Sequence, residues 1–592
     1  MSDWDLSEMD EEEEGEEEDS TPRPPLIVIK PRPPQATNTA LSSLAWLGNE
    51  TMLMVVGLLH DTCPRSVSSL ALVSSHYHHL ARYTQHREVV LDNTTRRKSN
   101  HSLDKLEFIE KSGIAAAVRR LEVRNGGSDA FESKLCRLLP KMTGLTDLTW
   151  LATGVPLPVL EILKGRPSVR LHTMFFRLSP SDDNAVDVIE RLEGNENLVS
   201  LRAIINYVRA AQCVRFIKPV KRVILSCPNL RKLELDVSLP RSGCVVYGLP
   251  AEYCGFGFVD GERPPALEEL ELGDYPFGSR APDYPSINSY ISFNQGYPLE
   301  ETEKDYWANV FDWSRLKRLA TYDIHFALKI VHQLTSLKEF CCIWDHGPVK
   351  TFYQQVPSSL ETIYVARCET IGLENLLRHG SSLKKLTIHK QEDYGGGWQQ
   401  GTVDAKTLAK IRDGCPHIEE MTLDIPRKKN WPYEVLDILA TFPRLRNLKI
   451  WFELGIGDKD NLVKPYVRFS EIEGFFNRLR ASAPRGTVGI RKLEVASGSP
   501  PDVGHGLLSS HAFWPQHNST NFVCVPADRE DEAARGICVV RCTLLNERQN
   551  EFLRKARPGV KYRNYPFSGH DEERFLVARD GPKSWSEWKP HY

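Results

Sequence analysis

A short pattern of apolar and polar positions recurs through most of the chain: apolar, two polar, apolar, one polar, apolar. Eight copies fit it closely: Leu145-Leu148-Trp150, Leu230-Leu233-Leu235, Leu267-Leu270-Leu272, Leu360-Ile363-Val365, Leu383-Leu386-Ile388, Ile418-Met421-Leu423, Leu445-Leu448-Ile450 and Ile490-Leu493-Val495. Looser copies begin at Val118, Val169, Leu198, Leu316 and Leu337. The thirteen starts run from 118 to 490, with intervals from 21 to 49 residues. Because the apolar positions at the end of each copy alternate, each copy predicts a short β-strand with one buried face.

Several copies follow a helical phrase that ends at a Pro or Gly, as in 158–164 before Pro167, 373–379 before Gly380 and 435–440 before Pro443. A helix, a stop and a short strand, repeated every 20–50 residues or so, are typical of a leucine-rich-repeat solenoid. Stacked repeats supply the core that one repeat lacks. The asparagine usual after the triplet is missing, since Asp236 follows Leu235. The sequence therefore predicts an α/β fold, an irregular leucine-rich-repeat solenoid over residues 96–495.

Long segments interrupt the repeats. Residues 238–264 and 273–312 are rich in Gly, Pro, Tyr and Asp, and residues 391–402 contain a Gly triplet, so all three are predicted to be loops. The pattern stops after 495. Within residues 496–592, a C-terminal cap or tail, the apolar runs 522–525 and 537–545 predict strands.

Residues 41–95 predict a separate small helical domain. Apolar residues at helical spacing predict one helix up to Leu59, with Asn49 as its N-cap. The next residues, Asp61 to Ser69, predict a loop, and a second helix is expected from Leu70. Two helices on so short a segment cannot bury all their apolar side chains against each other. The excess needs a cover, either the next domain or another protein.

Residues 1–40 predict a disordered acidic and Pro-rich tail. Residues 1–20 carry twelve acids and no Lys or Arg, which leaves 75 basic against 66 acidic residues in the remainder. A block of like charge repels itself and stays solvated, and the prolines of 22–34 favour an extended stretch. A docking tail for a basic partner, or a ligand for an aromatic-lined groove, is the alternative.

The composition bears on whether the protein spans a membrane, is secreted or stays inside the cell. The longest strongly apolar stretch, Met52 to Leu59, is eight residues long, whereas a membrane span needs about 20. The acidic start does not resemble a secretory signal. Thirteen cysteines without a CxxC pair favour a reducing compartment, cytoplasmic or nuclear.

Signals of an enzyme, a metal or a nucleic-acid site are weak. The nucleotide-binding, hydrolase-elbow and zinc-protease motifs are missing from the sequence. His76, His78 and His79 would spread around a helix, and Cys538 and Cys542 lack partners at zinc-finger spacing. Basic pairs such as those at 119–120 and 384–385 alternate with acidic pairs at 268–269 and 419–420. We therefore expect no catalysis, no cofactor, no membrane contact and no nucleic acid. A hydrolase or transferase within 496–592 would need a convergent pocket of acids or His.

The segment 41–95 resembles an F-box. Members of that family open a helix with Leu-Pro-x-Glu and carry a Leu-x-x-Val-Ser/Cys-Lys-x-Trp/Phe phrase on a second helix. The opening here is Leu47-Gly48-Asn49-Glu50, and the later phrase runs from Leu70 to Tyr77. Gly48 replaces the proline, Ser75 the basic residue and Tyr77 the usual Trp or Phe. The resemblance covers about 45 of the 592 residues.

The resemblance is to F-box proteins with leucine-rich repeats, of the type found in fungi, and it implies a function. In that family the F-box binds the Skp-type adaptor, and through it the cullin, of an SCF-type ubiquitin ligase, while the repeats hold the protein substrate. The implied adaptor-binding residues are Leu47, Gly48, Glu50, Leu53, Val56, Leu70, Val73 and Tyr77. The alternatives are a helical cap on the solenoid and a repeat scaffold that binds a partner without any ligase.

Solvent-facing positions of the repeat strands are the expected substrate surface. They comprise Glu234, Glu271, Tyr364, Thr387, Thr422 and Lys449. Their mixed charge, without clustered aromatic residues, indicates no ligand class. A solvated sheet face without a ligand is the alternative.

Overall fold

A computed structural model describes residues 48–92, 101–125, 127–152, 154–178, 185–206, 210–238, 256–259, 261–273, 275, 277, 303–342, 348–392, 402–427, 429–456, 461–484, 488–498, 510–527, 538–556 and 569–588. The chain divides after Thr84 into two compact units. We call residues 48–84 the helical unit and the described residues from 85 onward the sheet unit. The division falls before the boundary expected at 95, because the first strand of the sheet already begins at Glu88. The predicted tail, residues 1–40, lies outside the described residues.

The helical unit contains three helices in place of the two expected. They are α2 (Asn49–Thr62), α3 (Pro64–Ala71) and α4 (Ser75–Gln85). The loop predicted for 61–69 is therefore wrong. Pro64 stands at the start of α3, where the missing backbone N–H costs no helical hydrogen bond. Gly48, rather than Asn49, is the N-cap of α2.

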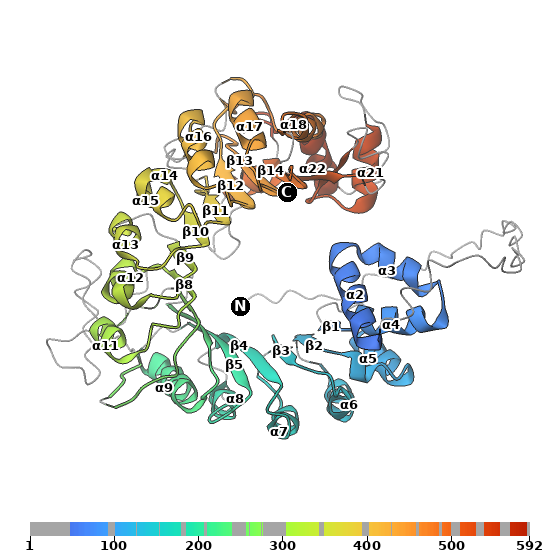
Figure 1. The fold of residues 1–592 in the computed structure, drawn as a ribbon, viewed down its shortest axis with the longest axis vertical. Helices are drawn as coiled ribbons and strands as arrows, with labels where there is room; N and C mark the ends of the chain where they lie inside the picture. The colour runs from blue at the N-terminus through green and yellow to red at the C-terminus, as the bar shows by residue number, and fades with distance from the viewer. Residues whose placement is uncertain are drawn as a thin grey trace, which may run out of the picture. The chain divides into compact units, whose positions relative to one another are not determined.

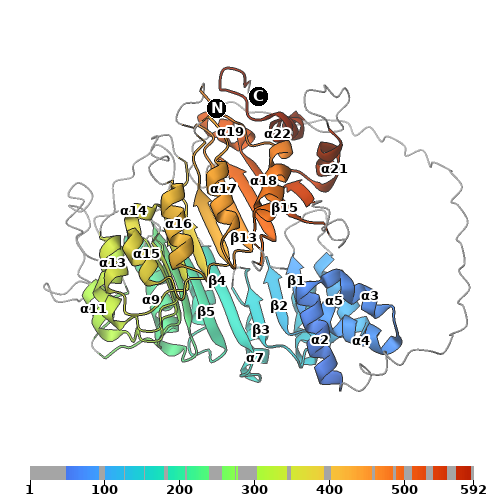
Figure 2. The same cartoon turned by 45° about the horizontal axis from the view of Figure 1, so that its top comes forward.

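One sixteen-stranded sheet organises the sheet unit, and its strands lie side by side in chain order (Figures 1 and 2). All neighbouring strands from β1 to β14 are parallel. The strands are β1 (Glu88–Asp92), β2 (Arg120–Arg124), β3 (Asp147–Trp150), β4 (Arg170–Leu178), β5 (Leu198–Asn206), β6 (Lys232–Ser238), β7 (Glu269–Leu272), β8 (Arg318–Thr321), β9 (Glu339–Cys342), β10 (Thr362–Val365), β11 (Lys385–Ile388), β12 (Glu420–Asp424), β13 (Asn447–Phe452), β14 (Lys492–Ser497), β15 (Thr520–Pro526) and β16 (Cys538–Cys542). β1 and β16 are the two ends of the order, so the sheet does not close into a barrel.

Helices connect the parallel strands and lie along one face of the sheet (Figure 1). They are α5 (His101–Lys111), α6 (Asp129–Leu138), α7 (Leu157–Lys164), α8 (Ala185–Glu190), α9 (Ala210–Ser226), α11 (Glu303–Val310), α12 (Ile324–Ile330), α13 (Val349–Gln355), α14 (Cys368–Ile371), α15 (Leu373–Arg378), α16 (Ala405–Gly414), α17 (Tyr433–Ala440) and α18 (Phe469–Ala481). The three helical phrases noted in the sequence coincide with α7, α15 and α17, which confirms them.

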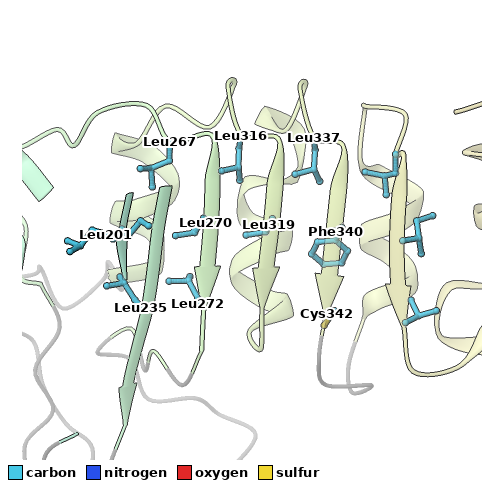
Figure 3. Packing of buried hydrophobic residues seen from close by; sticks show 14 of the residues in the cluster. Leu201, Leu235, Leu267, Leu270, Leu272, Leu316, Leu319, Leu337, Phe340 and Cys342 are labelled. Carbon is cyan, nitrogen blue, oxygen red and sulfur yellow. The ribbon is translucent and has the colours of Figure 1, made fainter. Parts of the chain in front are cut away.

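The apolar triplets form the core between the sheet and these helices. All thirteen predicted copies coincide with strands, β2 to β14. Figure 3 shows the triplet side chains of neighbouring strands stacked in rows on the same side, for example Leu270, Leu319 and Phe340. These three are almost fully buried. Because the strands are in register, each triplet is covered by the equivalent triplets on both sides.

The interrupting segments contribute an aromatic core, which the expectation of plain loops missed. Within 238–264 and 273–312, Phe256, Tyr275 and Phe277 contact Trp307 of α11, with ring centroids 6.0, 5.4 and 5.4 Å away. Amid these rings lies the carboxyl group of Glu303, which is 1% exposed. It accepts hydrogen bonds from Tyr275 Oη at 2.5 Å and Phe256 N at 3.0 Å. Burial raises the pKa of Glu303 to about 7.

The third interrupting segment, 391–402, is described only at its two ends. The carboxylate of Glu392 accepts hydrogen bonds from three successive backbone N–H groups, those of Leu454, Gly455 and Ile456, each at 2.7 Å. This carboxylate therefore ties the end of one repeat to the loop after β13.

The C-terminal segment extends the sheet. The two predicted strands exist as β15 and β16, but they add antiparallel, β15 to β14 and β16 to β15. The boundary expected at 496 lies inside β14, so the sheet continues across it. Among the described residues, three more helices follow the parallel region: α19 (Ser510–Asn518), α21 (Glu547–Lys555) and α22 (Gly569–Asp580). Trp514 and Trp588 pack with Leu454 and Ile456 in a small separate core.

Candidate functional site

The helical unit has a core of only five buried apolar side chains: Met52, Val56, Val67, Leu80 and Ala81. A helix that packs on one side leaves its other side to solvent or to a partner. This unit carries the residues assigned to the adaptor by the F-box resemblance, except Leu47.

Three of these residues are exposed. Gly48 caps α2, Glu50 lies in the first turn of that helix, and Val73 lies in the turn between α3 and α4 with 56% of its surface exposed. Leu47 lies outside the described residues. Gly48, Glu50 and Val73 are therefore free to contact another protein.

Four others take part in the core instead. Leu53, Leu70 and Tyr77 are half-buried and pack against it. Val56 is 0% exposed, so a partner cannot reach it, and its assignment to the adaptor surface is corrected here. The reason is geometric: Val56 lies one helical turn after Met52, on the face of α2 that packs on the rest of the unit.

The structure adds exposed apolar residues that the resemblance did not indicate. On α2, Met54, Val55 and Leu58 are 70%, 40% and 65% exposed, and Leu72 beside Val73 is 88% exposed. A signal was present in the sequence, because 52–59 is apolar on every side of a helix and only one side can face the core. We call Met54, Val55, Leu58, Leu72 and Val73 the exposed apolar residues of the helical unit.

In the sheet unit, the predicted substrate residues lie on the face of the sheet that α5 to α18 do not cover. Side chains alternate along a strand, so the residues between the buried triplet positions point away from the helices. Parallel register places them level with one another. The level row comprises Arg202, Glu234, Glu271, Ala320, Cys341, Tyr364, Thr387, Thr422, Lys449 and Glu494. All six predicted positions therefore fall in one row.

Charges in this row are largely paired within the protein. Arg202 Nε lies 2.6 Å from a carboxylate oxygen of Glu234, and Lys449 Nζ lies 2.5 Å from Glu494. Glu271 pairs with Arg318 of the next strand at 2.9 Å. Burial, together with the neighbouring Glu271, raises the pKa of Glu234. A partly exposed pair contributes about 0–1 kcal/mol, so a bound partner can replace these contacts at little cost.

The centre of the row is uncharged from Ala320 to Thr422. Tyr364 and Thr422 are half-exposed there, whereas Thr387 between them is only 8% exposed. Thr387 is therefore corrected from a contact residue to a largely covered one; its neighbours in register are the larger Tyr364 on β10 and Thr422 on β12.

Two hollows are associated with the sheet. One of ≈ 230 Å³ spans β11 to β14 and includes Thr422 and Lys449. Another of ≈ 650 Å³ lies at the starts of β2 to β7 and includes Arg170, His172 and Asp147. In the second, Asp147 accepts hydrogen bonds from Arg170 at 2.8 Å and Thr146 at 2.9 Å. Charged side chains from several strands line both hollows, which suit protein side chains better than an apolar cofactor.

A His–Asp pair that the sequence reasoning missed lies at the other ends of β11 to β13. His389 Nδ1 lies 2.6 Å from Asp424 Oδ1, and the backbone N–H of Lys390 donates to Asp424 Oδ2 at 2.8 Å. Burial raises the pKa of Asp424, which the bond to His389 opposes. The ring of Trp451 stacks on His389 with centroids 4.4 Å apart. In the sequence, these three residues each directly follow an apolar triplet, in three successive repeats, so aligning the repeats would have found them.

Other features of the described residues concern ligands and cysteines. They contain no cluster of three or more His, Cys, Asp or Glu that could hold a metal ion. Cys341 is half-exposed and Cys342 is buried, which confirms the expected one-sided burial of this strand. A helix long and apolar enough to cross a membrane does not occur in the part of the chain that the structure describes.

Comparison with known proteins adds no relative. No protein-family model matches the chain. A search of curated proteins also finds no match.

Proposed function

We propose that the chain is the substrate-recognition subunit of an SCF-type ubiquitin ligase. In this proposal the helical unit is a divergent F-box that docks a Skp-type adaptor, and the sheet unit is an irregular leucine-rich-repeat solenoid that holds a protein substrate. The observation that carries the proposal is the exposure of Leu72 and Val73, which lie within the F-box-like phrase 70–77. Large apolar side chains left in solvent mark an interaction surface.

The repeat interpretation of the sheet unit has its own support. The parallel strands follow one another in chain order, and each carries one buried triplet. A fold in which each repeat contacts mainly its neighbours matches a stacked array. The irregular spacing of 21 to 49 residues corresponds to the long insertions before β7 and β8.

The proposed function requires no chemistry from this chain. Other subunits transfer ubiquitin, and this chain would raise the local concentration of substrate beside them. The adaptor surface would be the exposed apolar residues with Glu50 at its polar rim, since interfaces combine an apolar centre with a polar border. We place the protein in the cytoplasm or nucleus, which agrees with the free thiols of the ten described cysteines.

Copurification with a purified Skp-type adaptor tests the proposal. The full chain should bind the adaptor, and the double variant Leu72→Asp/Val73→Asp should lose it, because two charges would be placed against an apolar partner. Leu70 is left unchanged, since it packs on the core and its replacement would damage the unit. The control is Leu157→Asp, a similarly exposed leucine at the start of α7 in the sheet unit, which should bind normally.

A repeat scaffold without a ligase is the second candidate. Two observations favour it: Val56 is buried, and Gly48 stands where the family has proline. If the protein is such a scaffold, the folded full chain should fail to bind any Skp-type adaptor. A protein that binds the sheet unit should then bind the variant Leu72→Asp/Val73→Asp as well as it binds the unaltered chain. That result would replace the ligase proposal.

A further inference from the structure

The starts of the parallel strands form a charged edge. We define the strand-start edge as the first residue of each strand from β2 to β14 together with the residue before it. Backbone hydrogen bonds hold these positions level, as where Lys317 N donates to Glu268 O at 2.7 Å. Along the middle of the edge, acids lie between bases. Glu268 pairs with Lys317 at 2.7 Å, and Glu361 pairs with Lys384 at 2.7 Å and Lys338 at 3.1 Å.

The edge loses this balance at β13 and β14. Arg446 and Arg491 are direct neighbours, because Arg491 N donates to Arg446 O at 2.8 Å. Both side chains are exposed, and among the described residues neither has a carboxylate within ion-pair distance. Lys492 beside them makes only a 3.5 Å contact with Glu494, and Arg444 two residues before Arg446 is exposed as well. Arg446, Arg491 and Lys492 therefore adjoin at this end of the edge, with exposed Arg444 close to them in the chain, whereas Glu268 and Glu361 in the middle of the edge each pair with two bases.

A recess adjoins these cations. The hollow of ≈ 230 Å³ over β11 to β14 is lined by Lys385, Lys449 and Lys492 among others. Its two carboxylates, Glu420 and Glu494, are already engaged, Glu420 with Lys385 at 3.4 Å and Asn447 at 3.2 Å, and Glu494 with Lys449 at 2.5 Å. Lys492, which lines the hollow, directly follows Arg491, and Asn447, which also lines it, directly follows Arg446, so the hollow adjoins the two arginines in the chain.

We propose that the basic end of this edge, formed by Arg446, Arg491 and Lys492 together with the nearby Arg444 and the adjoining hollow, binds an acidic peptide segment of a protein partner. The inference rests on the proposed function, because it names the class of protein substrate that the sheet unit would hold. Carboxylates of such a segment would form charge-assisted hydrogen bonds with the two unpaired guanidinium groups, which bind carboxylates in bidentate geometry.

A protein partner fits better than a nucleic acid. A nucleic acid needs a continuous basic stripe, but Glu419 and Glu420 at the start of β12 interrupt the cations on one side. The basic residues also span only the starts of β13 and β14, a length that suits a few carboxylates rather than a run of phosphates. Contacts at such an exposed rim act mainly on the association rate and weaken with salt.

Fluorescence anisotropy of a labelled twelve-residue peptide of Asp and Glu, titrated with the full chain at low salt, tests the proposal. A peptide with Asn and Gln at the same positions is the ligand control. The variant Arg446→Glu/Arg491→Glu should weaken binding of the acidic peptide about tenfold or more, because two attractions become repulsions. The variant Arg446→Gln/Arg491→Gln, which adds no new charge repulsion, should weaken it less.

The matched control is Lys406→Glu/Lys410→Glu. It makes the same change of net charge on the exposed side of α16, away from the edge, and should bind the acidic peptide within about twofold of the unaltered chain. Circular dichroism of all variants establishes that they fold alike. A tenfold loss restricted to the arginine variants supports the proposal.

The proposal would be overturned if the acidic and amide peptides bound with equal affinity, or if the arginine and lysine variants lost affinity equally. It would also be overturned if a twelve-nucleotide single strand bound more tightly, with the same dependence on Arg446 and Arg491. A further contradicting result is an affinity for the acidic peptide at least tenfold higher after removal of residues 1–20, which would mean that this acidic segment of the chain itself occupies the basic end of the edge. Adaptor binding by the helical unit is measured separately, so failure of either proposal is distinguishable from failure of the other.

Discussion

The helical unit and the sheet unit differ in how far their apolar side chains are exposed. In the sheet unit the triplet side chains are buried almost completely, strand after strand. In the helical unit, Met54, Leu58, Leu72 and Val73 are each more than half exposed, although the unit is far smaller. A stacked repeat is covered by its neighbours on both sides. Three short helices have no such neighbours within their own unit, so their surplus apolar surface is what a partner can use.

Exposed surface of the sheet unit is different in kind. Its uncovered face carries ion pairs such as Arg202–Glu234, which the register brings together, and few large apolar side chains. Under the two proposals, the helical unit would bind its partner by apolar burial and the sheet unit by polar complementarity. Four experiments sharpen or break this contrast.

The largest effect is expected in the core of the sheet unit. Phe340 is fully buried on β9, and its ring stacks on Phe352 of α13 with centroids 3.9 Å apart. Phe340→Ala should lower the free energy of unfolding by about 3–5 kcal/mol, because it removes apolar contacts and leaves a cavity. Chemical denaturation followed by tryptophan fluorescence measures it. A loss below about 1 kcal/mol would mean that the repeats do not cover one another.

A pH-dependent effect of similar size is expected at Glu303. Its pKa in the folded protein is raised to about 7 by burial among aromatic rings. The folded state therefore holds this proton more tightly than the unfolded state, and stability falls as pH rises from about 4.5 to 7. A shift of this size corresponds to about 3 kcal/mol. Glu303→Gln should be more stable than the unaltered chain by about that amount at pH 8, and about equal to it at pH 4.5.

Thermal or denaturant unfolding at several pH values measures this difference. Glu269→Gln is the matched control, since Glu269 is a half-exposed partner of Lys232 and its replacement should not reproduce the pH profile. If Glu303→Gln and the unaltered chain show parallel profiles between pH 4.5 and 8, the carboxyl is not held in the aromatic core.

A smaller effect separates the two sides of α2. Val56 faces the core and Leu58 faces solvent. Val56→Ala should cost about 2 kcal/mol from lost burial and the resulting cavity, whereas Leu58→Ala should change stability by less than about 0.5 kcal/mol. Hydrogen exchange of residues 49–84 measures both. Equal effects would mean that Leu58 is covered within the chain, and the proposed partner surface would be lost.

The strands of the sheet unit were predictable because alternation is a local property of the sequence. All thirteen triplets became strands, even where the copies were loose. The aromatic core around Trp307 was not predictable from the sequence. It joins Phe256, Tyr275 and Trp307 across segments rich in Gly and Pro, and the composition of turns says nothing about long-range packing. The antiparallel pairing of β15 and β16 was missed for a similar reason, because strand direction depends on the connection rather than on the strand.

The site was predicted unevenly for related reasons. Periodicity placed Glu234, Tyr364 and Lys449 correctly on one face, because side chains alternate along a strand. It did not show that Thr387 is covered, which depends on the size of its neighbours. On α2, spacing identified apolar positions but not their direction, and the F-box resemblance assigned Val56 outward while Met54 and Leu58 were overlooked.

The smallest expected effect concerns the paired charges of the strand-start edge. Lys384 and Lys338 hold the pKa of Glu361 below its usual range. A depressed carboxyl pKa gives stability that is present above about pH 4.5 and is lost as pH falls through the lowered pKa. Because the group is largely solvated, Glu361→Gln should cost less than about 1 kcal/mol at pH 7, and molar salt should shrink the difference further. Denaturant unfolding at low and high salt measures it. A salt-independent loss of several kcal/mol would show that these pairs carry the fold, and the division between an apolar core and exchangeable surface charges in the sheet unit would then be incorrect.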